Sequence, residues 1–189
     1  MPIPLIVPAT PEPQTLDEIL DWHSSIVGAL VEQRASILKA ILQSSGVAPR
    51  FVGMTEGEIE ARYDADRREL DRLTVLNLVA SAEGTVKLDF NRRVQGRLKD
   101  SLAIAYRKWN KTLSARKQRR PDFDRGGILD VLRDANVMEN HIIREYRECL
   151  EARHWVAHGR YWCKPVGVDQ LVPDVVFDRA DAIIRALPA

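Results

Sequence analysis

The sequence predicts an all-α fold, an antiparallel helical bundle of four to five helices with a proline-rich N-terminal arm. Apolar residues recur at steps of three and four over most of the 189 residues, which is the period of an amphipathic helix. Thr15 and Thr55 are each followed three residues later by a glutamate, and these two capping boxes mark helix starts. No segment alternates as a strand would, and residues 164–172 are interpreted as a loop.

The chain divides into an extended arm, residues 1–14, and a single helical domain, residues 15–189. The arm holds five prolines, and we expect its apolar residues to dock on a partner subunit. The domain has enough apolar residues for one core, since 45% of the chain is hydrophobic. Its first helix is predicted over residues 15–43, with a bend at Gly28, and a loop follows over residues 44–54.

The second helix is predicted to begin at the capping box of Thr55, to pass Gly84, and to continue to Leu98. Residues 91–120 then hold eleven lysines and arginines against one acid, first in a helical region and then in a loop. Residues 128–132 are expected to form a short helical turn. The penultimate helix is predicted to begin at Asn136 and the final helix near Pro173.

The basic region suggests a polyanion as partner, because clustered lysines and arginines attract phosphates. Its loop offers four candidate RNA-binding residues, Arg116, Lys117, Arg119 and Arg120. The alternative is a solvated helix face followed by a flexible loop.

Residues 153–162 have the composition of a chemical site, with two arginines, two histidines and three large aromatic side chains. Gly159 is predicted to end the penultimate helix, so that Arg153 projects from the last turn and His158 swings toward the same point. Arg153 lies on a predicted apolar stripe, where a charge needs a partner. The stripe comprises Ile142, Tyr146, Cys149, Leu150, Arg153, Val156 and Ala157.

Glu83 is a carboxylate on an apolar face of the second helix, and the simplest interpretation is that it pairs with Arg153. The alternative is that Glu83 reaches solvent at a kink near Gly84.

The Arg153–His158 spacing at a helix end resembles the motif of the higher eukaryotes and prokaryotes nucleotide-binding (HEPN) domain family, and the resemblance extends over residues 15–187. It implies a small all-α, metal-independent endoribonuclease of a toxin, phage-defence or CRISPR-associated system. It also implies a homodimer with a composite active site. Some relatives carry a modified tyrosine two positions after the histidine, where this chain has Arg160, so modification of the following Tyr161 is not implied.

The expected mechanism is attack of the RNA 2′-hydroxyl on the adjacent phosphate. His158 would transfer protons and Arg153 would neutralise the growing charge, while His154 and Arg160 would orient the substrate or hold flanking phosphates. Tyr161 and Glu83 are further supporting candidates. The alternatives are a non-catalytic RNA- or nucleotide-binding or protein-interaction module of a defence complex, and a purely structural role in which both residues satisfy helix carbonyls.

Other chemistries find little support in the sequence. His154 and His158 have a metal-binding spacing, but no third ligand or intervening glutamate is evident, so we expect no metal and no cofactor. Two cysteines and the absence of an apolar run of eighteen residues favour a cytoplasmic protein that neither spans a membrane nor is secreted. Its expected partners are RNA, a second copy of the chain, and an antitoxin or another regulatory protein.

Overall fold

The computed structural model describes residues 13–44, 46–96, 98–115, 122–160 and 163–188. Within these ranges the chain is all-α, with no strand, as predicted. The helices are α1 (Leu16–Leu42), α2 (Glu56–Gln95), α3 (Ser101–Ala115), α4 (Ile128–Asp134), α5 (Asn140–Ala157) and α6 (Pro173–Arg185), with single 3₁₀ turns η1 (Pro49–Phe51) and η2 (Val168–Gln170). Of the predicted N-terminal arm, residues 1–12 lie outside the described residues.

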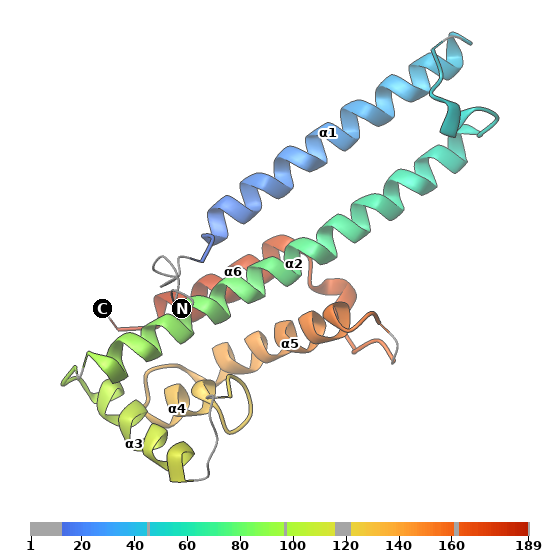
Figure 1. Ribbon diagram of the computed structural model, residues 1–189. Coiled ribbons are helices and arrows are strands. Elements are labelled where there is room, and N and C mark those ends of the chain that lie inside the picture. Colours follow the sequence, from blue (N-terminus) through green and yellow to red (C-terminus); the bar gives the residue numbers. More distant parts are fainter. Residues whose placement is uncertain (1–12, 45, 97, 116–121, 161–162, 189) are drawn as a thin grey trace, which may run out of the picture.

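The long helix α2 is the centre of the molecule (Figure 1). Helix α1 runs antiparallel along its N-terminal half, whereas α5 and α6 pack on its C-terminal half. Both capping boxes are present, because Thr15 and Thr55 each accept a bond from the N–H of the glutamate three residues on. The α2 helix continues without interruption through Gly84, and Glu83 does not reach solvent freely, because only 13% of its side chain is exposed.

Two apolar clusters hold this arrangement together. The larger one lies between the C-terminal half of α2, helices α3 to α6 and the start of α1, which contributes Leu16 and Ile19. In it the buried Tyr146 hydroxyl donates to the Val79 carbonyl over 3.0 Å. The smaller one closes the tip of the α1–α2 hairpin and consists of Ile37, Phe51, Ile59 and Tyr63. The hairpin therefore has an apolar anchor at each end.

The long helix ends at Gln95, and the prediction that it continues to Leu98 is wrong. The Gly96 N–H donates to the Arg92 carbonyl over 2.8 Å and closes the helix. A new helix then begins, because the Asp100 carboxylate accepts the Ala103 N–H over 2.9 Å. Aspartate is a strong N-cap residue, and this cap separates α3 from α2.

The predicted start of the penultimate helix at Asn136 is also wrong. Asn136 has a φ of 55° and lies between α4 and α5, in the left-handed region that asparagine tolerates better than most residues. Helix α5 begins at Asn140. The final helix begins at Pro173, as predicted, and residues 164–172 contain the turn η2 and no strand.

None of the helices in the described ranges combines the length and the apolar character that crossing a membrane requires.

Candidate functional site

The C-terminal turns of α5 line an open groove with a volume of about 620 Å³. The opposite walls come from α2 and from the loop that precedes α4. The lining residues are Glu83, Asp122, Phe123, Asp124, Arg125, Leu150, Glu151, Arg153, His154 and Pro165. The groove thus contains two members of the sequence motif and the predicted partner of one of them.

Helix α5 ends at Ala157, two residues before Gly159, the predicted stop. The Gly159 N–H donates to the Val156 carbonyl over 3.2 Å, and the Arg160 N–H donates to the Trp155 carbonyl over 3.1 Å. These two bonds form a Schellman motif, for which Gly159 supplies the left-handed backbone with a φ of 77°. The motif fixes the position from which His158 leaves the helix.

The buried face of α5 is rotated about the helix axis relative to the predicted apolar stripe. Its buried residues are Ile143, Tyr146, Cys149, Ala152 and Trp155, whereas Ala157 is exposed. Arg153 consequently lies at the edge of the buried face, with 36% of its side chain exposed. The guanidinium is held by the protein on one side and faces the groove on the other.

The ion pair between Arg153 and Glu83 is present. Arg153 Nη2 lies 3.6 Å from Glu83 Oε2, and Lys87 Nζ binds the other carboxylate oxygen. Glu83 is mostly buried, with 13% of its side chain exposed. Because Glu83 also binds Lys87, its single negative charge only partly neutralises Arg153.

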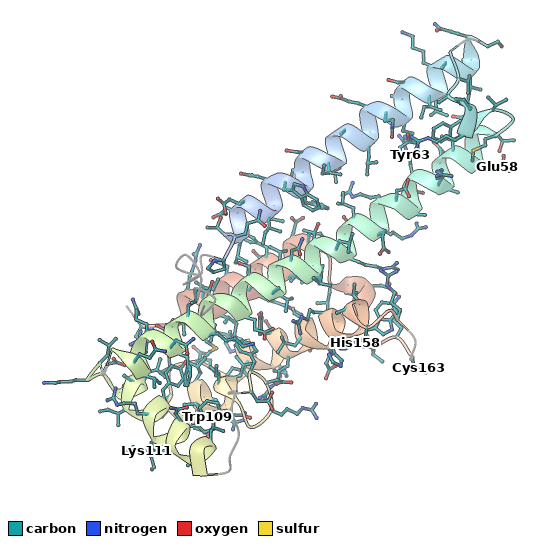
Figure 2. The ribbon with its side chains drawn as sticks, viewed as in Figure 1. Glu58, Tyr63, Trp109, Lys111, His158 and Cys163 are labelled. Carbon is teal, nitrogen blue, oxygen red and sulfur yellow. The ribbon has the colours of Figure 1, made fainter. Side chains whose placement is uncertain are left out.

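The structure brings His154 into the groove beside Arg153, but His158 is not among the residues that line it. Both histidines are exposed, and their ring centroids lie 4.3 Å apart with the planes at 61°. Figure 2 shows His158 at the C-terminal end of α5. Within one chain, therefore, His158 contacts His154 but does not line the groove with Arg153, as the sequence had predicted it would.

Arg160 forms an ion pair with another residue of the fold. Its guanidinium binds the Glu69 carboxylate of α2 and lies 5.9 Å from the centre of the Trp155 ring. The hydrogen bond from Arg160 lowers the pKa of Glu69, and the same bond raises the pKa of Arg160. This pair ties the segment after α5 to α2. The neighbouring candidate Tyr161 lies outside the described residues.

The opposite wall of the groove is fixed by Arg147 of α5. Its Nε donates to Asp124 over 2.7 Å and its Nη2 donates to Asp130 over 2.9 Å. Asp130 also accepts the Gly126 N–H over 2.6 Å. Burial favours the neutral form of Asp130, but the bonds from Arg147 and Gly126 outweigh it and lower its pKa.

The groove is electrically mixed. Its lining includes four carboxylates alongside two arginines and a histidine. Three of these carboxylates pair with cations, since Glu83 binds Arg153 and Lys87, Asp124 binds Arg147, and Glu151 lies 3.8 Å from Arg125. A phosphate entering here would therefore compete with carboxylates for the arginines.

The predicted RNA-binding residues Arg116, Lys117, Arg119 and Arg120 lie outside the described residues. In the sequence, Arg120 stands two positions before Asp122, which lines the groove. Two other basic residues of the region are structural. Arg93 is 1% exposed and binds Asp89 and Asp100, and Arg107 donates to the carbonyls of residues 93 and 98.

Sequence reasoning missed the wall formed by residues 122–125 and the two cations that support the groove, Lys87 and Arg147. The turn-rich composition of residues 121–127 indicated only a loop. No sequence spacing indicates that Arg147 holds that loop against α5. Its partner Asp124 is 23 residues away along the chain, and its partner Asp130 is 17 residues away. Lys87 stands four residues after Glu83, and this helical spacing could have identified it.

In the described part of the chain, no group of three or more histidine, cysteine or acidic residues is placed to hold a metal ion. Comparisons with protein-family models, with curated proteins and with solved structures find no match.

Proposed function

We propose that this protein is a metal-independent endoribonuclease of the HEPN type that acts in a cytoplasmic toxin or phage-defence system. The observation that supports this proposal is the open groove in which Arg153 and His154 lie together, with the His158 ring against His154. A fixed guanidinium beside two imidazoles matches the needs of phosphodiester cleavage, which are charge neutralisation and proton transfer near neutral pH.

In the proposed reaction, the RNA 2′-oxygen attacks the adjacent phosphorus while its proton passes to an imidazole. The bond to the 5′-oxygen breaks, and that oxygen takes up a proton. The products are a 2′,3′-cyclic phosphate and a 5′-hydroxyl. Arg153 would neutralise the charge that grows on the non-bridging oxygens, His158 would transfer a proton, and His154 would orient the phosphate.

The position of His158 favours a dimer in this proposal. In one chain it lies outside the groove lining, so a second copy that places its own His158 over the groove would complete the site. The basic residues Arg116, Lys117, Arg119 and Arg120 would hold flanking phosphates, because their segment leads into the groove wall at Asp122. An antitoxin or another regulatory protein would restrain the activity.

The test is digestion of RNA in the presence of a chelator by the wild type and by the Arg153→Ala and His158→Ala variants. We expect each variant to lose about 10² to 10³-fold in rate, the usual cost of removing a preorganised group that stabilises the transition state. His141→Ala is the matched control, because His141 is also exposed and lies in the first turn of the same helix. Equal cleavage by all four proteins would refute the proposal.

The carboxylates of the groove favour a second candidate, a non-catalytic binding module of a defence complex. Glu83, Asp124 and Glu151 would repel RNA but would suit a basic segment of a partner protein. This candidate predicts no cleavage by the wild type. It would be favoured further if Glu151→Gln strengthened RNA binding without producing any cleavage.

A further inference from the structure

The two histidines at the end of α5, His154 and His158, have side chains of a type that can bind metal ions. They are four residues apart, and the His158 N–H donates to the His154 carbonyl over 3.1 Å, so the last helical bond fixes both backbones. Both side chains are exposed, and their ring centroids are 4.3 Å apart. The geometry of the helix thus presents two imidazoles to solvent at one point.

This separation is close to that of two imidazoles on one metal ion. A ring nitrogen binds a transition metal at about 2.0–2.1 Å, which puts the ring centres of two neighbouring ligands roughly 4.5–5 Å apart. Small rotations of the two rings would reach this range. Imidazole suits copper, nickel and zinc, and affinity for such a site rises to a maximum at Cu²⁺.

We propose that His154 and His158 together chelate one late first-row transition-metal ion, with water in its remaining positions. Water completes the coordination, because no larger group of protein ligands is found among the described residues. Because His154 lines the groove, a bound ion lies beside the groove. It occupies one nitrogen of each imidazole, and those two nitrogens can then no longer transfer protons. The metal is then an inhibitor of the site rather than its cofactor, a consequence that rests on the proposed function.

The binding test is titration of the full chain with Cu²⁺ at neutral pH, followed by electron paramagnetic resonance. All proteins carry Cys163→Ser, because Cys163 is exposed and its thiol would compete for copper. We expect one ion with two nitrogen ligands, and at least tenfold weaker binding in both His154→Ala and His158→Ala. His141→Ala should bind as the parent does. Undiminished binding in either variant of the pair, or an equal loss in His141→Ala, overturns the metal site.

The inhibition test adds Ni²⁺ to the RNA cleavage reaction of the same parent protein. We expect the rate to fall as the site fills and to recover when a chelator removes the ion. Full cleavage with the site occupied overturns the inhibitory role. A parent that binds metal but never cleaves RNA leaves the chelate intact and refutes the proposed nuclease, so the two failures are distinguishable.

Discussion

Arg153 and Arg93 carry the same charge in very different surroundings. Arg93 is buried, with 1% of its side chain exposed, and it binds Asp89, Asp100 and the Pro188 carbonyl. Arg153 is about one-third exposed, and its partner Glu83 retains Lys87 when Arg153 is removed. The cost of deleting an arginine depends on whether a buried charge is left without a partner.

We therefore predict that Arg93→Ala lowers the free energy of unfolding by about 3–5 kcal/mol, as expected for breaking a buried pair. Arg153→Ala should lower it by less, about 1 kcal/mol, because Arg153 is partly exposed and Glu83 keeps Lys87 as a partner. Urea unfolding of both variants measures the difference. Similar losses in the two variants would show that Arg153 is as structural as Arg93.

Gly28 and Gly159 differ in backbone conformation, so replacing each with alanine should have opposite effects on stability. Gly28 lies within α1, and Gly159 has a φ of 77° at the end of α5; an added Cβ would meet nothing within 4 Å at either position. Gly28→Ala should raise the free energy of unfolding by about 0.5–1 kcal/mol, because alanine loses less entropy in a helix. Gly159→Ala should lower it by about 1–2 kcal/mol, because L residues are strained there. Thermal unfolding checks the opposite signs.

At the scale of elements, the groove depends on how Arg147 of α5 holds the loop before α4. The loop has no helix or strand between residues 122 and 127. It is held by the buried Phe123 side chain, by backbone hydrogen bonds to the start of α4, and by the bonds of Arg147 to Asp124 and Asp130. The Asp130 carboxylate helps to join the loop to α5, because it accepts hydrogen bonds from both Gly126 and Arg147. Protonation of Asp130 would weaken this connection.

This connection predicts a dependence of stability on pH. The pKa of Asp130 is lowered in the folded chain, so its contribution is fully present above the ordinary aspartate pKa of about 4 and is lost as the pH falls through the folded value. Urea unfolding between neutral and acid pH should show a smaller acid loss in Asp130→Asn than in the wild type. Asp178→Asn, at an exposed position on α6, is the control and should keep the wild-type dependence.

At the scale of the whole molecule, the α1–α2 hairpin and the groove are separate features of one long helix. The apolar cluster at the tip contains Ile37, Phe51, Ile59 and Tyr63, whereas the groove draws on α2 only at Glu83. The proposed dimer must instead act at the groove end, where His158 is exposed. In the proposed nuclease, assembly of the dimer therefore decides whether the motif forms a complete site.

Mixing two inactive variants tests this assembly. If each site takes Arg153 from one subunit and His158 from the other, then unfolding Arg153→Ala and His158→Ala together and refolding them as mixed dimers should restore part of the RNA cleavage. Each variant refolded alone should stay inactive. Sedimentation verifies that the mixed species is a dimer, and an inactive mixed dimer would contradict the composite site.

The sequence predicted the presence of the helices better than the points where consecutive helices end and begin. Both capping boxes and the stop at Gly159 were predicted correctly, because each depends on bonds between residues a few positions apart. The end of α2 at Gln95 and the start of α5 at Asn140 were missed, since the apolar pattern continues past both points. The Arg153–Glu83 pair was predicted because a charge on an apolar face needs a partner.

The all-α class, the helix caps and the glycine that ends α5 could be predicted from the sequence, because these follow from local periodicity and short-range hydrogen bonds. Only the tertiary structure decided that His154 rather than His158 lines the groove, and that residues 122–125 form its other wall. Those outcomes depend on the rotation of α5 about its axis and on the contacts of Arg147 with a distant loop. Packing between helices sets both, and no local pattern in the sequence contains that information.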